Sequence, residues 1–397
     1  MPLKVLFFHP AASFGGASKS LVELVKAFPT GTVEATVICP KGSVVRAFQE
    51  AGMKVIAAWG LSQWDNTLFS YYRGWRWGVL LRELVFLPHS LHALWRAWRI
   101  GPYDLIHLNE VTLLPVGLLA QKLLRLPLVV HVRSLQRGEA RDARTRWFTR
   151  HLLNRADAVI AIDETVRRTL PNRLPVRIVH NGIRVCPEER GQTAKKRFRV
   201  GMIGGLLKVK GVYEFFEAAR ILLKEREIDA EFVVAGENAR ELSGPMGWLL
   251  RKLDLGHDVR ADLESFAKAH NLEERVRLVG FVNDVQSIYK ELDLLCFPSY
   301  LDAAGRPVFE AAFFSVPSVV AVRNPPSDTI VQGETGLCID YPDARKLAEV
   351  IEYFYRNRDE CIRMGENAKR LAHKNFVIEN NAIQIYSIYE SILAQRS

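Results

Sequence analysis

The sequence contains few cysteines and no long apolar run. Its five cysteines are scattered along 397 residues and are odd in number, which argues against a disulfide framework or a paired-cysteine metal site and favours a reducing cytosol. No apolar run is long enough to cross a bilayer. The opening residues Met1 to Lys4 lead directly into an apolar strand and lack the layout of a signal peptide. We therefore expect a cytoplasmic protein without a metal site.

The composition is that of a folded globular protein rather than a disordered one, with 48% hydrophobic and 25% charged residues. A chain of 397 residues is too long for one ordinary core and is sufficient for two domains. The net charge of +10, with an isoelectric point near 9.4, favours anionic partners such as phosphates, anionic lipid or nucleic acid.

Short apolar runs alternate with amphipathic stretches throughout the chain. Most runs are almost continuously apolar, which is typical of strands that helices cover on both faces. We predict strands at Lys4–His9, Glu34–Cys39, Lys54–Ala58, Leu105–Leu108, Leu128–Val132, Ala158–Ile162, Val176–Val179, Arg199–Ile203, Glu231–Ala235, Val276–Val279, Leu294–Phe297 and Ser318–Val322. Helices such as Val212–Glu225 lie between them, and this alternation predicts an α/β fold of parallel, right-handed βαβ units.

The two halves of the chain repeat the same alternation and are separated by a polar segment. This segment, Arg184–Arg197, has no apolar periodicity and is predicted to be the interdomain linker. We accordingly predict a first domain over residues 1–185 and a second over residues 196–376.

The segment from Phe297 to Pro317 is the most informative part of the chain. It places Asp302 and Glu310 eight residues apart. A predicted strand leads into the segment, and an expected helix has Glu310 near its start. Ligands bind at the carboxyl ends of the strands in open α/β sheets, and Gly305 would let a ligand approach the backbone closely. The alternative is a plain loop followed by an ordinary acid in the first turn of a helix.

This spacing resembles the acid-x7-Glu motif of the retaining glycosyltransferases of family 4, the group 1 glycosyl transferases, which have the GT-B fold. In the family a Glu is followed by a glycine three positions later and by Glu-Ala at the end, where this chain has Asp302, Gly305 and Glu310 followed by alanine. The resemblance implies that Glu310 binds the ribose hydroxyls of a nucleotide-sugar donor and that Asp302, shorter than the family's Glu, contacts the transferred sugar. Gly305, Arg306 and Pro307 would lie beside the donor.

The resemblance also implies the domain roles. GT-B proteins have two facing Rossmann-like domains with a cleft between them, so residues 1–185 would form the acceptor-side domain and residues 196–376 the donor-binding domain. The final helix of this fold usually crosses back to the first domain. Residues 377–397 are expected to do so here, with Asn380–Gln395 as the candidate helix.

Two glycine loops are predicted to handle phosphate. Gly15 and Gly16 follow the first strand and precede a helix, where free backbone N–H groups and the helix dipole favour an anion, although glycine turns are common. The loop resembles the family's glycine loop, which lies against the donor phosphates.

The second loop spans Gly201 to Gly211 and contains Gly204 and Gly205. The family pattern there is Gly-Arg-Leu, three residues, then Lys-Gly, which implies that Lys210 neutralises the donor diphosphate as a third catalytic residue beside the two acids. Gly205 stands where the family has Arg. Lys208 is either its replacement or a solvated loop lysine.

Two further turns resemble donor-binding segments of the family, although each could also be a simple turn. Gly236 follows a strand in the pattern of the family's glycine-rich turn near the nucleotide. Phe281 and Val282 match the segment whose backbone reads the base. Taken together, the motifs that resemble the family span residues Arg199 to Asp340.

The signals for an acceptor site are fewer. His107 and His131 lie near the ends of two predicted strands, and Arg133 stands where many relatives have a histidine that contacts the donor sugar. An arginine can bond a sugar hydroxyl or a phosphate. The alternative for both histidines is a hydrogen-bonded side chain in a packed strand.

Residues 73–99 form a basic segment rich in aromatic side chains. A helix after Pro88 would place basic residues on one side and apolar residues on another, and the two sets are His89, His92, Arg96 and Arg99 against Leu91, Leu94, Trp95 and Trp98. This is typical of an interfacial helix that binds anionic lipid. The alternative is a helix packed on the first domain with its tryptophans in the core.

The resemblance implies a retaining, metal-independent glycosyltransferase without a cofactor. It would move a hexose from a UDP- or GDP-sugar to a sugar or lipid-linked acceptor in polysaccharide, lipopolysaccharide or glycolipid assembly. We expect it to be cytoplasmic, peripheral on the inner face of the membrane, and not to bind nucleic acid. The alternatives are a non-catalytic relative that binds sugar nucleotides and a GT-B sugar-nucleotide epimerase.

Overall fold

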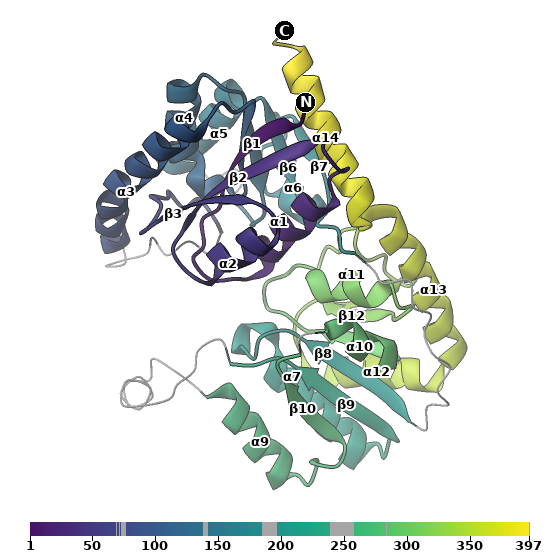
Figure 1. Ribbon diagram of the computed structural model, residues 1–397. Coiled ribbons are helices and arrows are strands. Elements are labelled where there is room, and N and C mark those ends of the chain that lie inside the picture. Colours follow the sequence, from purple (N-terminus) through teal and green to yellow (C-terminus); the bar gives the residue numbers. More distant parts are fainter. Residues whose placement is uncertain are drawn as a thin grey trace. The chain divides into compact units, whose positions relative to one another are not determined.

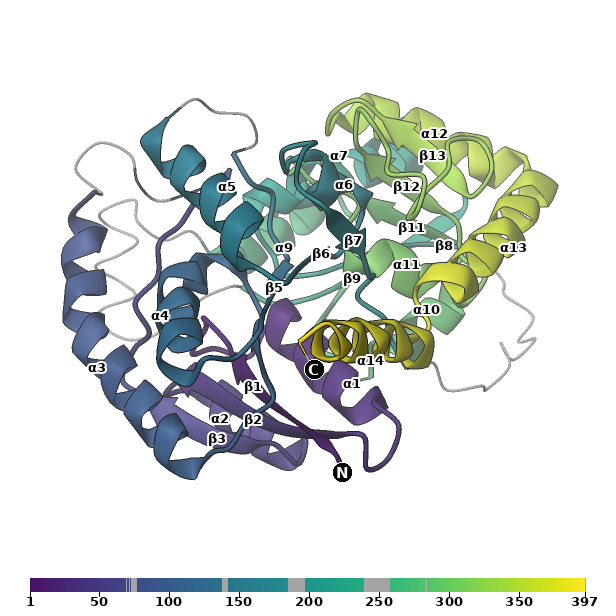
Figure 2. The same cartoon turned by 90° about the horizontal axis from the view of Figure 1, so that it is seen from above.

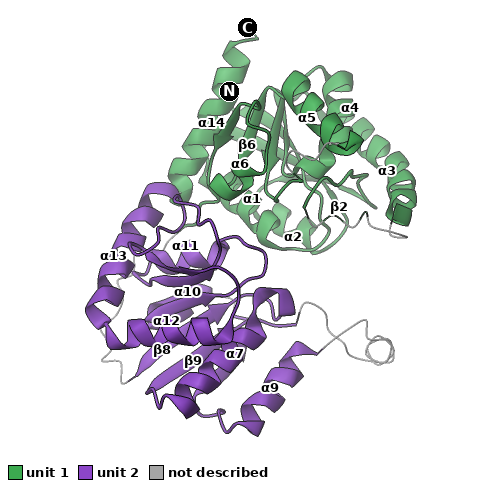
Figure 3. Ribbon diagram, turned by 180° about the vertical axis from the view of Figure 1, so that it is seen from behind, with its two compact units in different colours: residues 1–184, 376–397 green, residues 185–375 purple. Residues whose placement is uncertain are grey.

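The computed structural model describes residues 1–68, 70, 72, 77–137, 142–184, 197–238, 258–282 and 284–396. The chain divides into two compact units, residues 1–184 with 376–397 and residues 185–375 (Figure 3). Most of the predicted linker Arg184–Arg197 lies outside the described residues, as does the start of the basic segment at residues 73–76.

Unit 1 is built on a seven-stranded parallel sheet in the order β3-β2-β1-β4-β5-β6-β7. The strands are β1 (Leu3–Phe8), β2 (Val33–Pro40), β3 (Lys54–Ala58), β4 (Leu105–Leu108), β5 (Leu128–Val132), β6 (Ala158–Ala161) and β7 (Val176–Ile178). The central strands β4 and β5 are buried at every position, as their apolar sequences require. All seven predicted strands are confirmed to within one residue at each end.

Helices cover both faces of this sheet (Figures 1 and 2). They are α1 (Gly16–Ala27), α2 (Ser43–Glu50), α3 (Val79–Ile100), α4 (Leu114–Leu124), α5 (Ala143–Arg155), α6 (Glu164–Arg168) and α14 (Ile378–Ala394), with a 3₁₀ turn at Val111–Leu113. The C-terminal helix α14 packs Ile385 and Tyr389 into the same core as Leu21 and Leu24 of α1. Unit 1 therefore joins the two ends of the chain in one hydrophobic core.

Helix α3 corrects one prediction. The helix begins at Val79, not after Pro88, and Pro88 lies in its interior. The eight residues before the proline, Leu80 to Leu87, consist mostly of strong helix formers such as leucine, arginine and glutamate. Pro88 is exposed, so water can satisfy the carbonyl that loses its helical donor.

Unit 2 is built on a six-stranded parallel sheet in the order β10-β9-β8-β11-β12-β13. Its strands are β8 (Phe198–Ile203), β9 (Ala230–Ala235), β10 (Val276–Gly280), β11 (Leu294–Phe297), β12 (Ser318–Ala321) and β13 (Gly336–Ile339). Five of them match the predictions to within one residue. The edge strand β13 was not predicted, because it is short, with four residues of which the first is glycine.

The described helices of unit 2 are α7 (Val212–Arg220), α9 (Val259–Ala269), α10 (Val285–Glu291), α11 (Arg306–Ala312), α12 (Ala344–Arg356) and α13 (Arg358–Asn375), with a π turn at Ile221–Glu225 that completes the predicted helix Val212–Glu225. Phe215 and Phe216 of α7 and Ile351 of α12 are fully or almost fully buried and pack against β8 and β9 in one core.

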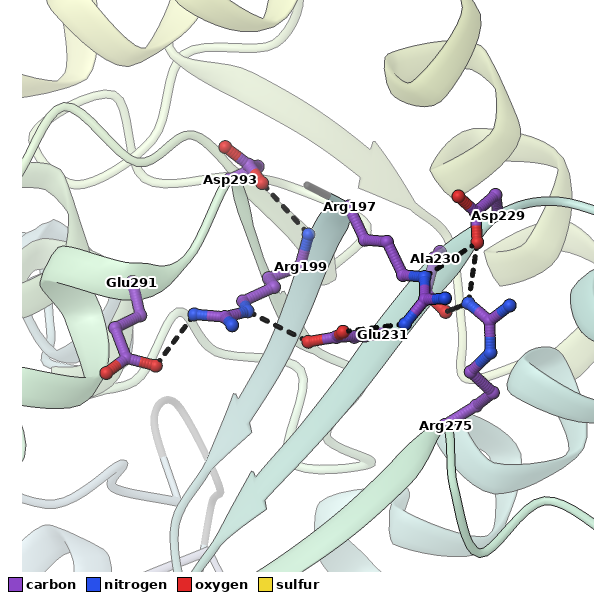
Figure 4. A network of polar contacts seen from close by, with 8 residues as sticks. All are labelled: Arg197, Arg199, Asp229, Ala230, Glu231, Arg275, Glu291 and Asp293. Atoms are coloured by element: carbon purple, nitrogen blue, oxygen red, sulfur yellow. Dashed lines mark hydrogen bonds and ion pairs between the residues drawn. The ribbon is translucent and has the colours of Figure 1, made fainter. Parts of the chain in front are cut away.

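A network of ion pairs ties the amino ends of the strands in unit 2 (Figure 4). Arg199 bonds both Glu231 of β9 and Glu291 of α10, each at 2.9 Å. The other charged members are Arg197, Asp229, Arg275 and Asp293. Partly exposed pairs of this kind contribute about 0.2–1 kcal/mol each. These pairs stabilise the sheet at the amino ends of its strands. The loops at the carboxyl ends of the strands remain available for other roles.

Candidate active site

Both sheets have a topological switch point, where the strand order reverses. It lies between β1 and β4 in unit 1 and between β8 and β11 in unit 2. Ligands of open α/β sheets bind outside the carboxyl ends of the strands at such a point. The loops that leave these four strands are therefore the candidate functional elements.

In unit 2 the loop after β8 and the loop after β11 are hydrogen-bonded to each other. The Tyr300 N–H donates to the Val209 carbonyl at 3.0 Å, and the Ser299 hydroxyl donates to the same oxygen at 3.4 Å. The phosphate loop predicted at Gly204–Gly211 and the two-acid segment therefore lie together at one edge of the sheet.

Lys210 is half-buried at this edge. Its ammonium lies 5.2 Å from the centre of the Phe297 ring, within the range of a cation–π contact. Burial lowers the pKa of Lys210 below its usual value. A partly desolvated cation gains from an anionic ligand, whereas Lys208, at the start of the same 3₁₀ turn Lys208–Lys210, is exposed.

Glu310 is buried, and both of its carboxylate oxygens accept hydrogen bonds. The Tyr289 hydroxyl donates to Oε2 at 2.8 Å, and Arg306 Nε donates to Oε1 at 2.6 Å. Burial, with the nearby Glu310 charge, raises the pKa of Tyr289 well above its usual value, so its hydroxyl stays protonated. A carboxylate has about four acceptor positions, and the two bonds described here hold the carboxyl group of Glu310 in one orientation.

Asp302 is exposed, and its backbone adopts the left-handed conformation with φ of +50°. Aspartate tolerates this region better than most residues. Its Oδ1 accepts the Arg323 N–H at 2.9 Å, just beyond the end of β12. The side chain thereby links the loop after β11 to the neighbouring strand end.

The predicted donor-binding glycines differ in what they do for the fold. A Cβ added at Gly236 would lie 1.8 Å from the Gly204 oxygen, and one at Gly305 would lie 2.3 Å from the Phe297 ring, so internal packing requires both glycines. A Cβ at Gly15 or Gly16 would meet no atom within 4 Å. Internal packing does not require glycine at these two positions. Pro307 lies in the first turn of α11, where proline is favoured.

Gly205 is likewise exposed, and an added Cβ there would meet only the Glu237 oxygen, at 3.8 Å. The Glu237 side chain serves the predicted base-reading turn, because its Oε1 accepts the Phe281 N–H at 3.2 Å. Phe281 itself is 69% exposed, and Val282 is half-buried.

At the switch point of unit 1, His9 is the centre of a buried polar chain that the sequence did not predict. Its Nε2 lies 3.0 Å from Ser18 Oγ and its Nδ1 lies 2.9 Å from Asn109 Nδ2. Arg133 has only donors, and its Nε donates to Asn109 Oδ1 at 2.9 Å, which fixes the amide orientation. His9 Nδ1 is therefore the acceptor, and its Nε2–H donates to Ser18.

Arg133 lies just beyond the end of β5 and is held from three sides. Besides Asn109, its guanidinium donates to Asn181 Oδ1 and, at 3.3 Å, to His131 Nδ1. Burial, and then the Arg133 charge, lowers the pKa of His9 to about 3. The arginine therefore carries the charge of this network, and His9 is neutral.

His107 and His131 are buried in the middle of the sheet. His107 Nδ1 lies 2.6 Å from the Tyr389 hydroxyl of α14, and the two imidazole rings are 5.5 Å apart. Burial, and then the Arg133 charge, lowers the pKa of His107 to about 3 and that of His131 well below its usual value. This placement favours the alternative of hydrogen-bonded histidines in packed strands.

Glu110, which the sequence patterns did not indicate, lies two residues after the end of β4. Its Oε1 accepts the Val111 N–H at 2.8 Å, and burial raises its pKa to about 7. A carboxyl group that titrates near neutral pH at a switch point is a candidate functional group. Its position after a buried strand is the signal that could have identified it.

Comparison with known proteins identifies the family. The model described as glycosyl transferases group 1 matches residues 187–371, and the model described as glycosyltransferase family 4 matches residues 14–185. A lipopolysaccharide core biosynthesis mannosyltransferase of Rhizobium leguminosarum bv. viciae is 28% identical over 77% of this chain and 83% of that protein. The alpha-D-kanosaminyltransferase of Streptomyces kanamyceticus is 25% identical over 69% and 73%.

A solved structure is similar over the whole chain. The Anabaena protein Alr3699/HepE, in complex with UDP, gives a TM-score of 0.74 at 19% identity and covers 98% of this chain and 100% of that chain. This similarity supports the GT-B fold predicted from the sequence, with its two Rossmann-like units. The chain is therefore a glycosyltransferase and belongs to the group 1 glycosyl transferases, glycosyltransferase family 4.

Proposed function

We propose that this glycosyltransferase moves a hexose from a UDP- or GDP-sugar to an acceptor hydroxyl and binds the donor at the carboxyl edge of the sheet in unit 2. The observation that carries the proposal is Glu310, a buried acid held by Tyr289 and Arg306 beside the switch point. Its carboxylate would accept the two ribose hydroxyls of the donor. The related Anabaena structure, which holds UDP, supports the donor class.

The proposed reaction retains the anomeric configuration, does not use a metal and has no protein nucleophile. Lys210 and the loop at Gly204–Gly205 would stabilise the departing diphosphate electrostatically. The leaving phosphate would take the acceptor proton on the same face of the sugar, and Asp302 would hold the sugar. Gly16 and Gly15, which internal packing does not require to be glycines, would allow the phosphates close approach to the backbone.

We assign acceptor binding to unit 1. Arg133 lies at the carboxyl end of β5, and Asn109 and Asn181 orient its guanidinium. Such a fixed fork can bond a sugar hydroxyl or a phosphate. The relative named for lipopolysaccharide core biosynthesis supports an acceptor in polysaccharide, lipopolysaccharide or glycolipid assembly.

We also propose that unit 1 attaches peripherally to the cytoplasmic face of a membrane through α3. Among the described residues, no helix has both the length and the apolar character needed to cross a bilayer. The outer side of α3 carries an exposed apolar stripe at heptad spacing, formed by Leu81, Leu84, Leu91, Trp95 and Trp98. These side chains are between 43% and 69% exposed.

The inner side of the same helix is less apolar than this stripe. It buries Glu83, Ser90, Ala93, Leu94 and Ala97. The Glu83 carboxylate accepts the Gln63 N–H at 2.7 Å, and Ser90 accepts the Ser62 N–H at 2.9 Å. Leu94 therefore belongs to the core, but both tryptophans face outward. A helix with its larger apolar side chains facing outward is typical of an interfacial surface.

A donor-hydrolysis screen tests the proposed function. Purified protein is incubated with UDP- and GDP-hexoses without acceptor, and the released nucleoside diphosphate is measured. We expect slow hydrolysis of one donor that is lost in Glu310→Gln and retained without divalent metal. Absence of hydrolysis and of binding for every nucleotide sugar would contradict the proposal, and formation of an epimerised nucleotide sugar would favour the epimerase alternative.

A further inference from the structure

A basic hollow lies in unit 1 at the ends of three helices. Its charged and polar lining includes Lys122 and Arg125 from the end of α4, His151 and Arg155 from α5, and Arg396 after α14. The end of α4 is joined to that of α5 by the Gln121 side-chain amide, which donates to the Arg155 carbonyl at 2.8 Å. The hollow is therefore a defined feature of the fold.

The cations of the hollow are only partly compensated by negative charge. Within the described parts of the chain, Lys122, Arg125 and Arg155 form no ion pair, whereas Arg396 pairs with Asp157 at 2.7 Å. Helix ends favour single basic residues, because each carboxyl end carries a partial charge of about −0.5. The three helix ends and Asp157 together offset about two and a half of the four positive charges of Lys122, Arg125, Arg155 and Arg396. The hollow thus keeps a net positive charge that suits a phosphate, which arginine can bond with two donors.

An apolar groove adjoins the basic hollow. It is lined by Leu91, Leu94, Trp95 and Trp98 of α3 and by Leu123 and Leu124 of α4. Helix α4 lies between α3 and α5 (Figures 1 and 2), so its last turn contributes Lys122 to the hollow and the next residue, Leu123, to the groove. Leu123 is 58% exposed and continues the apolar stripe of α3.

We propose that the basic hollow binds the phosphate headgroup of an anionic membrane phospholipid while Trp95, Trp98 and Leu123 insert among the acyl chains. The proposal rests on the membrane attachment proposed above and adds a lipid class and a second element to it. An apolar surface alone would bind any bilayer, whereas cations placed beside it give a preference for anionic lipid. The hollow would thus determine which membrane the enzyme selects.

The test is vesicle flotation with the full-length protein at low salt. Vesicles of phosphatidylcholine alone are compared with vesicles that also contain phosphatidylglycerol. Two variants lower the net charge equally: Lys122→Gln with Arg155→Gln in the hollow, and Lys268→Gln with Arg277→Gln on unit 2. All four residues are exposed, and melting curves check that both variants fold.

We expect the hollow variant to lose about 30-fold of its partition onto anionic vesicles, corresponding to about 1 kcal/mol for each cation. Its partition onto neutral vesicles should not change. The unit 2 variant should bind anionic vesicles nearly as the wild type does. Trp95→Ala with Trp98→Ala should weaken binding to both kinds of vesicle.

Three outcomes would overturn the assignment in distinguishable ways. Equal losses in the two charge variants would mean that net charge, not the hollow, attracts the protein to the membrane. Wild-type protein that stays in solution with all vesicles would overturn the membrane attachment as well. If inorganic phosphate raised the melting temperature of the wild type but not of the hollow variant, and both bound vesicles equally, the ligand would be a free anion.

Discussion

Replacing Glu310 by glutamine should weaken nucleotide binding only when the ligand carries ribose hydroxyls. A hydrogen bond to a charged group contributes about 1.5–3 kcal/mol, so the variant should bind the nucleoside diphosphate of the donor roughly 10- to 150-fold more weakly. Glutamine has one acceptor oxygen where glutamate has two. One of the Tyr289 and Arg306 donors would therefore face an amide NH₂ group instead of an acceptor.

The mispaired donor inside the site and the lost bond to ribose can be separated by a thermodynamic cycle. Calorimetry measures the affinity of the wild type and of Glu310→Gln for the nucleoside diphosphate and for its 2′,3′-dideoxy analogue. If Glu310 accepts the hydroxyls, the mutation should cost affinity for the natural ligand and almost none for the analogue. Tyr289→Phe is the matched control, since it removes one partner of the carboxylate but keeps the carboxylate itself.

Equal losses for the two ligands would refute the assignment, because the mutation would then act through the fold of the site and not through the ribose. Melting curves show how much of the change is structural. A buried donor left without an acceptor costs about 1–3 kcal/mol, and we expect a lower melting temperature in Glu310→Gln for this reason.

Lys210→Met should weaken binding of the diphosphate roughly 10- to 150-fold by calorimetry and leave binding of the bare nucleoside nearly unchanged; equal losses would show that Lys210 does not contact phosphate. Gly305→Ala should lower the melting temperature, because its Cβ would overlap the Phe297 ring, whereas Gly16→Ala should leave the melting temperature unchanged and weaken donor binding. The raised pKa of Glu110, near 7 in the folded state against an ordinary value of 4.5, means that its neutral form favours folding at low pH and that this contribution is lost as pH rises from about 4.5 to 7. Chemical denaturation should therefore show that the stability of the wild type relative to Glu110→Gln falls across this interval, and a constant difference would contradict the shift.

Sequence patterns predicted the strands well because each strand is a local, almost continuous apolar run. They missed β13, which has only four residues and begins with glycine. They also located Asp302 and Glu310 after the end of β11, because the spacing of two acids in the loop and helix that follow a strand is visible in the chain itself.

The hydrogen-bond partners of the site residues could not be predicted from the sequence in the same way. Tyr289 reaches Glu310 from the preceding helix, and Tyr389 reaches His107 across 282 positions of sequence. Such contacts depend on packing between elements, which local periodicity does not encode. The orientation of α3 is a similar case, since the backbone N–H groups of Ser62 and Gln63 determine that Ser90 and Glu83 face inward.

Unit 1 is assembled from two segments that are far apart in the sequence, and this has a consequence for biosynthesis. Residues 1–184 leave the ribosome first, but their core is completed only by residues 376–397. At about 5–20 residues per second, the ribosome needs roughly 10–40 s to make residues 185–397. During that time Leu21 and Leu24 of α1 lack the cover of α14. Unit 2, which is continuous in sequence, can finish folding first, so the newly made first half would be a natural client for chaperones until the last helix emerges.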